Sequence, residues 1–142
     1  MTELRFVVPG PPVGKARARV VLNRGKVRAF TPAKTANFEN LVRLAFVEKY
    51  PGHVPIEGAI TVTATAYFPV PKSMKVPKCI DWAKDYIPHT HRPDADNVSK
   101  SICDAGNGVI WRDDSQIYQM QIYKLYSLTP RTEIKIGYGG GK

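Results

Sequence analysis

The sequence contains little cysteine and no long apolar segment. Cys79 and Cys103 are its only cysteines, and because they form no Cys-x-x-Cys pair and make no disulfide framework, we expect both to be free thiols. No apolar run approaches the roughly 20 residues that cross a bilayer, and Met1-Thr2-Glu3 does not open a signal peptide. We therefore expect a cytoplasmic protein that has no membrane partner.

Acidic residues are also scarce relative to basic ones. The chain of 142 residues has 21 Lys and Arg against 12 Asp and Glu, which gives a net charge of +9. Its hydrophobic fraction of 43% and its charged fraction of 23% are typical of a soluble globular protein, and its length suits one domain. We expect a single domain over residues 1–142, with residues 139–142 as a disordered tail.

The basic residues are concentrated near the N-terminus, where residues 1–30 contain seven of them against one acidic residue. A hairpin with its turn at residues 23–25 would carry two pairs of basic residues on one ribbon, because residues two apart in a strand point the same way. A solvated hairpin without a partner is one interpretation. The other is a phosphate-binding surface, whose candidate residues are Lys15, Arg17, Arg19, Lys26 and Arg28.

Apolar patterns along the chain predict alternating strands and helices. One helix is expected to begin at Thr31-Pro32 and to end at Pro51-Gly52, and a second to begin near residue 94. Residues 69–93 contain five prolines, which predicts an irregular surface excursion with a helical turn near residues 80–86. Strands are predicted at residues 4–8, 58–68, 117–126 and 133–138, with a short one at 109–111.

Acidic residues cluster in one short region of this basic chain. The cluster consists of Asp94, Asp96, Asp104, Asp113 and Asp114. Crowded carboxylates are costly without a counter-ion, and a divalent cation held by oxygen ligands would supply one. Asp94 and Asp96 lie at the expected start of the second helix, where the helix dipole also favours negative charge.

The end of the second helix determines where the later acidic residues lie. Gly106 is a candidate C′ residue, Asn107-Gly108 a tight turn, and a short strand over residues 109–111 would return Asp113 and Asp114 to the helix start. Three or four carboxylates would then converge in an all-oxygen site that suits Mg²⁺ or Mn²⁺ rather than zinc. The alternative is that the same residues cap helices and form surface salt bridges.

Lys100 lies one helical turn after Asp96 and one before Asp104. A lysine beside a metal cannot be a ligand, but it would stabilise negative charge in a transition state, help to orient the attacking water, or pair with the two aspartates. The apolar stripe of the same helix lies on another face and consists of Val98, Ile102 and Ala105.

A composite motif covers this region. It reads Asp94-x-Asp96-Asn97-x-x-Lys100, followed by Asp104, Asn107-Gly108, Trp111 and Asp113-Asp114-Ser115-Gln116-Ile117. The motif closely resembles that of the RusA family of Holliday junction resolvases. The breaker Pro9-Gly10-Pro11-Pro12 and residues 15–19 are similar to the N-terminal strand and basic loop of that family, so the resemblance covers most of the chain.

The resemblance implies a small α+β domain in which two main helices pack a mostly antiparallel or mixed β-sheet. It also implies a homodimeric crossover junction endodeoxyribonuclease, bacterial or phage-encoded, that cuts symmetric strands of four-way DNA junctions with Mg²⁺ in recombination and repair. Matched by position, the metal-binding residues are Asp94, Asp96 and Asp114, and Lys100 is the essential basic residue. Asp113 is a further candidate ligand, and Asp104 matches an acidic position of less certain role. The lysine-rich stretch at residues 70–91 is longer than in the shortest members of the family.

Two other functions remain open. A non-catalytic basic protein would bind DNA architecturally and use its carboxylates as helix caps. A metal-dependent nuclease with another branched or single-stranded substrate would cut DNA without a preference for four-way junctions. Incubation with different DNA structures in the presence or absence of Mg²⁺ would distinguish all three.

Two further groups of side chains have alternative interpretations. His89-Thr90-His91 has the spacing of a two-histidine metal pair, but no third soft ligand is evident, so loop histidines are the favoured interpretation. Tyr118, Tyr123 and Tyr126 would stack on unpaired bases or, as strand residues, pack the sheet or a dimer interface.

Overall fold

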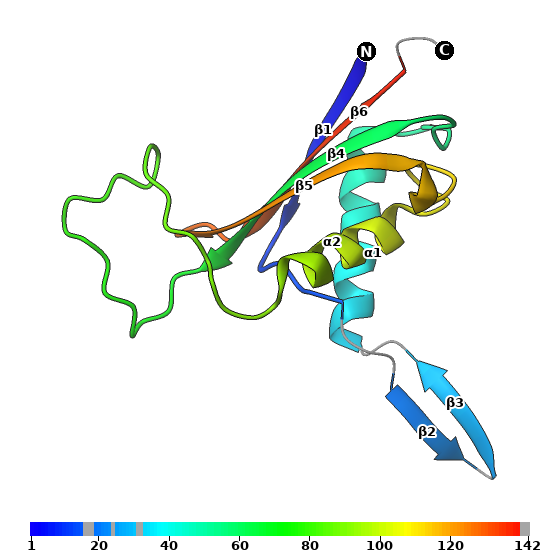
Figure 1. Cartoon of the computed structure of the whole chain (residues 1–142), viewed down its shortest axis with the longest axis horizontal. Helices are drawn as coiled ribbons and strands as arrows, with labels where there is room; N and C mark the ends of the chain where they lie inside the picture. The colour runs from blue at the N-terminus through cyan, green and yellow to red at the C-terminus, as the bar shows by residue number, and fades with distance from the viewer. Residues whose placement is uncertain (16–18, 24, 31–32, 140–142) are drawn as a thin grey trace.

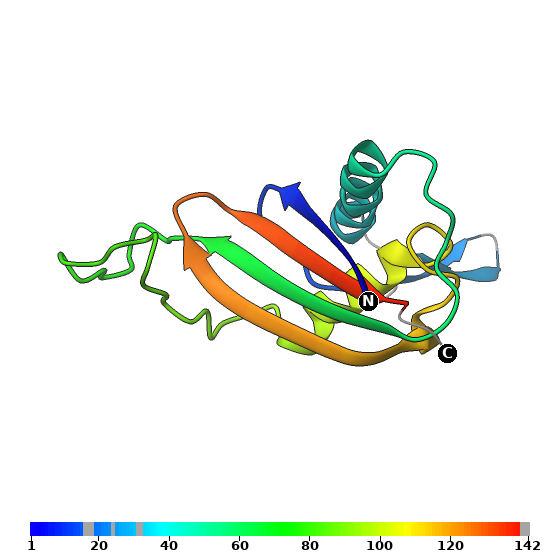
Figure 2. The same ribbon diagram turned by 90° about the horizontal axis from the view of Figure 1, so that it is seen from above.

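Strands with alternating apolar residues build a four-stranded sheet. The computed structural model describes residues 1–15, 19–23, 25–30 and 33–139, and its sheet has the strand order β1-β6-β4-β5 (Figure 2). Every second residue of β4 is buried, as the sequence pattern predicts. The bounds are Thr2–Pro9 for β1, Ile60–Pro69 for β4, Ile117–Ser127 for β5 and Arg131–Tyr138 for β6.

The sheet is mixed because one of its connections contains a helix. β1 and β4 both pair with β6 in antiparallel orientation, whereas β4 and β5 run parallel. The chain between these two parallel strands includes α2 (Ala95–Gly106), and parallel neighbours need a crossover of this kind. The predicted small α+β domain with a mixed sheet and two main helices is therefore confirmed.

Both helices bury an apolar stripe in the core. α1 (Ala33–Lys49) buries Phe38, Val42 and Phe46, and the stripe predicted for α2 is also buried. The two helices cross beside the sheet (Figure 1). The expected start of α1 at Thr31-Pro32 lies outside the described residues. Within the described part of the chain, no helix has the length and apolar character that crossing a membrane requires.

A two-stranded ribbon stands apart from the sheet. Its strands, β2 (Arg19–Asn23) and β3 (Lys26–Phe30), pair in antiparallel orientation, which confirms the predicted hairpin. In Figure 1 the ribbon lies at one end of the molecule, and the excursion formed by residues 70–91 lies at the other. This excursion is irregular, as predicted, and its expected helical turn is a single turn in which the Asp85 N–H donates to the Asp81 carbonyl (2.7 Å).

The segment after α2 differs from the prediction. Residues 108–110 form a turn and Trp111 makes isolated β-bridges instead of the predicted strand, while the Ile110 N–H donates back to the Gly106 carbonyl (2.9 Å). Gly106 is the last helical residue instead of a C′ residue. It lies against the fully buried Trp111, and a Cβ on Gly106 would be 2.4 Å from that indole ring. The indole of Trp111 thus packs closely against the end of α2 at the place where the sequence predicted a short strand.

Candidate functional site

The two acidic residues at the start of α2 are exposed and unpaired. Asp94 occupies the N-cap position, but its carboxylate makes no capping hydrogen bond. Asp96 follows in the first turn, and neither carboxylate forms a hydrogen bond or an ion pair with any described residue. The free N–H groups and the dipole of the helix stabilise negative charge at this end. The start of α2 thus presents two carboxylates that are available to an external cation.

The second acidic pair has protein contacts of its own. Asp113 precedes the short 3-10 helix η1 (Asp114–Gln116), and its carboxylate accepts a hydrogen bond from the Ser115 N–H (3.1 Å). The side-chain oxygen of Gln116 accepts from the Asp113 N–H (2.8 Å), which completes a capping box. The hydrogen bond with Ser115 lowers the pKa of Asp113. Asp113 therefore stabilises the turn, as the helix-cap interpretation predicts.

Asp114 is the first residue of η1, an element that contacts α2. Asp96, Lys100 and Cys103 lie on one face of α2 because they follow at i, i+4 and i+7. Burial, and next the charge of Asp114, raise the pKa of the Cys103 thiol to about 11. The Asp114 carboxylate therefore lies near Cys103, a position about 10 Å along the helix from Asp96 at 1.5 Å per residue.

The structure corrects the expectation that Asp113 and Asp114 return to the start of α2. The turn after the helix holds them at its C-terminal end, and among the described residues no three acidic, histidine or cysteine side chains gather closely enough to hold a metal ion. The chemistry of the donors nevertheless fits a hard cation, because Asp94 and Asp96 offer only oxygen ligands and have no protein partner. These two residues could hold Mg²⁺ or Mn²⁺.

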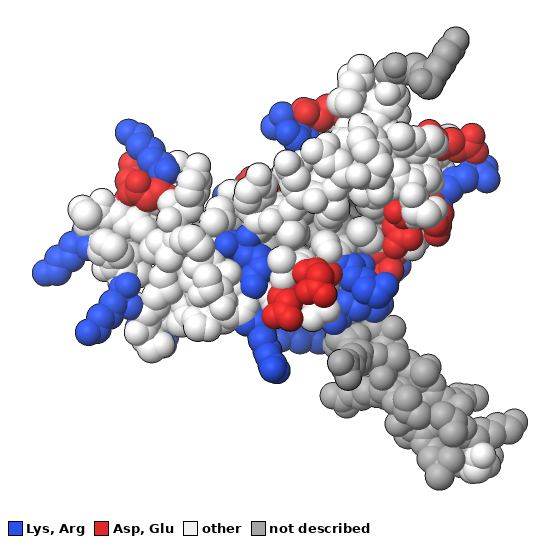
Figure 3. Space-filling model, viewed as in Figure 1, with Lys and Arg blue, Asp and Glu red and all other residues white. Residues whose placement is uncertain are grey.

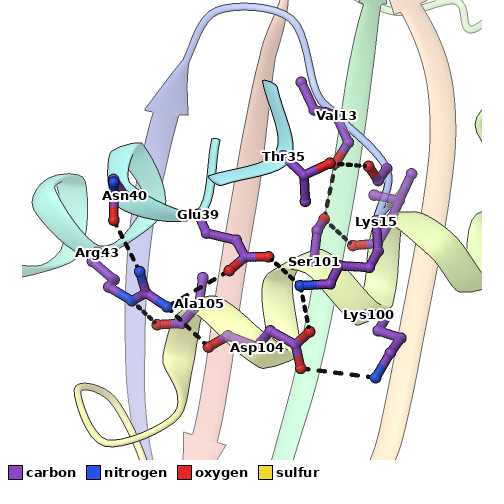
Figure 4. Close-up of polar contacts among 12 residues, drawn as sticks. Val13, Lys15, Thr35, Glu39, Asn40, Arg43, Lys100, Ser101, Asp104 and Ala105 are labelled. Carbon is purple, nitrogen blue, oxygen red and sulfur yellow. Dashed lines mark hydrogen bonds and ion pairs between the residues drawn. The ribbon is translucent and has the colours of Figure 1, made fainter. Parts of the chain in front are cut away.

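Lys100 belongs to a chain of ion pairs that joins α2 to α1 (Figure 4). Its ammonium lies 3.9 Å from Asp104 Oδ1, while Asp104 Oδ2 lies 3.1 Å from Lys15 Nζ. Lys15 Nζ also contacts Glu39 Oε2 at 2.8 Å. The Lys100 side chain is 62% exposed, so its ammonium can contact an external anion. Asp104 lies between two lysines and has a structural role.

Lys15 makes its contacts inside the protein. Only 20% of its side chain is exposed. Burial acts to lower the pKa of Lys15, but hydrogen bonds to Glu39 and Asp104 outweigh burial, and the pKa is raised overall. The charged ammonium thus bridges two carboxylates on different helices. This placement favours an anchoring role for Lys15 over the predicted contact with phosphate.

The chain segment before the ribbon is fixed against the start of α2. The Lys15 N–H donates to the Asn97 carbonyl (2.8 Å). Gly14 packs so closely on the residue before Asp94 that a Cβ on Gly14 would lie 2.5 Å from the Cβ of Pro93. The basic ribbon therefore begins at a fixed point beside the acidic end of the helix.

The other predicted phosphate ligands belong to the ribbon and its connection. Arg19 is the first residue of β2, and Lys26 and Arg28 lie on β3. Pairing of these strands confirms that the three positions share one ribbon. Arg17 lies outside the described residues.

The histidine pair is divided between the core and the surface. His89 is buried and stacks on Phe68, with ring centroids 3.9 Å apart, whereas His91 is exposed. Burial, and next the charge of Lys124, lower the pKa of His89. His89 is thus a packing residue, in agreement with the interpretation favoured from the sequence.

The three tyrosines of β5 are divided in the same way. Tyr126 is buried in the core, while Tyr118 and Tyr123 are 68% and 49% exposed. The packing interpretation therefore holds for Tyr126, and the exposed rings of the other two are accessible to a partner.

Several residues that support the site were not identified from the sequence. Glu39 is buried and bonded to Lys15, and Arg43 donates to the Ala105 carbonyl at the end of α2 (3.0 Å). The Ser101 hydroxyl donates to the Val13 carbonyl (2.9 Å). One signal was present for Glu39, because it continues the buried stripe of α1 at the i−3 position from Val42.

Comparison with known proteins places these features in a family. A family model described as "Endodeoxyribonuclease RusA" matches residues 9–137, a span that contains both acidic pairs, Lys100 and the ribbon. The chain is also similar to "Uncharacterized protein YqaN" of Bacillus subtilis (strain 168), with 35% identity over 138 residues that cover 96% of each chain. Because the family model covers nearly the whole domain and includes the acidic start of α2, this chain belongs to the RusA endodeoxyribonuclease family.

Proposed function

We propose that this protein is a Mg²⁺-dependent endonuclease that resolves four-way DNA junctions by paired, symmetric phosphodiester hydrolysis in recombination and repair. The observation that carries the proposal is the unpaired carboxylate pair of Asp94 and Asp96 on the start of a helix, in a chain with a net charge of +9. Acidic groups that attract a cation and a basic surface that attracts a polyanion are the two requirements of a metal-dependent nuclease. Membership of the RusA family supports DNA as the substrate.

In this proposal Asp94 and Asp96 hold the metal, with Asp114 as the third ligand that the family motif implies, and Mn²⁺ would replace Mg²⁺ because the ligands are all oxygens. Asp94 and Asp96 have no competing protein contact. Asp114 would have to move from its position in η1 towards these two residues when the cation binds, because no three acidic side chains gather closely enough among the described residues. Asp113 is not included among the ligands, because its carboxylate caps η1.

The chemistry is the hydrolysis of a phosphodiester. When bound, the metal supplies polarisation of the scissile phosphate and a water molecule of lowered pKa. Lys100 is exposed one helical turn after Asp96, where its ammonium would stabilise the negative charge that develops on the phosphate oxygens. The water oxygen forms a new bond to phosphorus while the bond to the 3′ oxygen breaks, and the 3′ oxygen takes up a proton. The products are a 5′-phosphate and a 3′-hydroxyl, which a ligase can join.

In this proposal the ribbon binds the arms of the DNA junction. Arg17, Arg19, Lys26 and Arg28 would contact backbone phosphates, an interaction that weakens steeply as the salt concentration rises. Lys15 would act mainly as the anchor of the ribbon, because Glu39 and Asp104 already surround its ammonium. A homodimer would place two active sites on a substrate with two-fold symmetry, so that paired incision needs no second enzyme.

The test is incubation of the protein with four-way, three-way, duplex and single-stranded DNA of matched sequence, each with Mg²⁺ or with EDTA, followed by mapping of the nicks. The expected result is symmetric nicking of the four-way junction in Mg²⁺ and binding without nicking in EDTA. Binding without cutting under both conditions would support an architectural DNA-binding protein instead. Equal cutting of all branched or single-stranded substrates would support a nuclease of different specificity.

A further inference from the structure

The lysine loop, which comprises residues 70–91, carries positive charge that the proposed cleavage site does not use. Its four lysines are all exposed, and none forms an ion pair with a described residue. Figure 3 shows basic side chains pointing outwards at the end of the molecule that this loop forms. The lysines are Lys72, Lys75, Lys78 and Lys84. Unpaired lysines in such a group suit a polyanionic partner.

The two acidic residues of the lysine loop form no ion pair with its four lysines and leave the loop with a net charge of +2. Asp81 Oδ1 accepts a hydrogen bond from the Ala83 N–H (3.0 Å), and Asp85 Oδ2 accepts from the Asp81 N–H (2.8 Å). Both carboxylates therefore hold the turn at residues 81–85. Their bonds shape the loop and leave its ammonium groups facing solvent.

The returning end of the lysine loop is fixed to the sheet. The His89 N–H donates to the Lys124 carbonyl (2.9 Å), and the Tyr126 N–H donates to the Ile87 carbonyl (3.0 Å). Lys124 Nζ donates to the His91 carbonyl (2.7 Å), and the ring of His89 stacks on Phe68. The loop thus extends from a defined base along the edge of β5.

The lysine loop and the ribbon reach the acidic start of α2 from two directions. The loop continues through Arg92-Pro93 directly into Asp94. The segment leading to the ribbon packs on the same place through Gly14, whose Cβ position lies against Pro93. The two basic segments then diverge to opposite ends of the molecule, as both views show (Figures 1 and 2). A phosphate chain lying across Asp94 would therefore have basic residues on each side.

We propose that the lysine loop binds the phosphate backbone of a junction arm on the side of the cut opposite to the ribbon. This inference rests on the proposed function, because it takes the DNA to lie across the start of α2. Lysine ammonium groups on an irregular loop contact phosphates as point charges without reading bases. The loop would therefore strengthen binding to arms of any sequence and leave the chemical step unchanged.

The test compares two variants that each lose two positive charges. Lys75→Gln with Lys78→Gln removes charge from the lysine loop, and Lys49→Gln with Lys135→Gln removes it from exposed positions outside the loop and the ribbon. The dissociation constant for a four-way junction is measured in EDTA at salt concentrations from 50 to 200 mM. Two lost phosphate contacts should reduce the salt slope by about 2 units, so that this rise in salt weakens the loop variant roughly tenfold less than the wild type. The control variant should keep the slope of the wild type.

An unchanged slope in the loop variant, or equal changes in both variants, would overturn the proposal. Junctions with progressively shortened arms provide a second measurement, because the difference between the wild type and the loop variant should disappear once the arm no longer reaches the loop. The cleavage rate at saturating protein in Mg²⁺ separates this inference from the proposed function. Absence of cleavage by the wild type would refute the nuclease, whereas wild-type cleavage with an unaltered salt slope would refute only the role of the loop.

Discussion

The two acidic pairs have the same carboxylate groups in different surroundings. Asp94 and Asp96 lie at the start of α2, whereas Asp113 and Asp114 lie beyond its other end. The first pair is exposed on a helix start and has no protein partner within the described residues. In the second pair, one carboxylate caps η1 and the other lies near the partly buried thiol of Cys103. The comparison shows that the carboxylate of Asp113 is less available to a cation than those of Asp94 and Asp96, because it already accepts a hydrogen bond.

The largest difference between the two pairs is expected in catalysis. Asp94→Asn or Asp96→Asn should reduce the single-turnover cleavage rate by more than about a thousandfold, because each removes a charged metal ligand, and junction binding should persist. Asp114→Asn should also abolish most cleavage. Asp113→Asn should retain cleavage, since its carboxylate belongs to the turn. Similar losses in the Asp94 and Asp113 variants would erase the distinction between the pairs.

Metal-linked stability is the next measurement. Mg²⁺ at 100 times its dissociation constant should raise the free energy of unfolding of the wild type by about 2.7 kcal/mol. The gain should be absent in Asp94→Asn and present in Asp113→Asn, as thermal unfolding with and without Mg²⁺ would show. Ca²⁺ serves as a control for the choice of cation, and stabilisation of Asp94→Asn equal to that of the wild type would place the metal elsewhere.

The contact between Gly106 and Trp111, which lies between the two pairs in the sequence, can be tested by substitution. Gly106→Ala should lower the free energy of unfolding by about 1–3 kcal/mol, because the new methyl group would overpack the buried indole of Trp111. Urea unfolding measures this loss. Asn37→Ala at an exposed position of α1 is a matched control that should be neutral or stabilising. A stable Gly106→Ala protein would contradict the close packing of Trp111 on the end of α2.

The smallest effect is expected from the cap of η1 and should depend on pH. The lowered pKa of Asp113 means that its carboxylate stabilises the fold above the ordinary carboxyl pKa, and this contribution is lost as the pH falls through the lowered value. Asp113→Ala should therefore reduce the melting temperature slightly at pH 7, with the difference from the wild type closing in strong acid. Asp94→Ala removes a carboxylate without a capping bond and should show a smaller loss at pH 7. An equal loss in both variants would indicate that the cap adds nothing.

The elements that could be predicted from the sequence depend on local periodicity. The alternation in β4 and the helical spacing of Phe38, Val42 and Phe46 mark buried faces without knowledge of the rest of the chain. The placement of Asp94 and Asp96 at a helix start depends on the same local pattern. The course of residues 107–111 could not be predicted in this way, because it depends on how the volume of Trp111 fits against a helix end.

Contacts between segments that are distant in the sequence account for the other differences between the sequence-based predictions and the structure. Lys15 looks like a phosphate ligand within its basic segment, but Glu39, 24 residues away, pairs with it in the folded protein. The approach of Gly14 to Pro93 is a similar case, since nothing near either residue indicates the other. Charge and spacing identified the chemistry of the candidate site, whereas tertiary packing determined which charges remained free.

The anchored base of the lysine loop has a consequence for how this protein can vary. Hydrogen bonds between residues 87–91 and β5 close the lysine loop after the end of β4. The register of the sheet therefore does not depend on how many residues lie between the end of β4 and residue 87. Insertions and deletions in this interval can change the reach of the molecule while the strands and α2 stay in place. The same independence makes the interval a suitable position for grafting a fluorophore or a foreign recognition segment without touching the carboxylates.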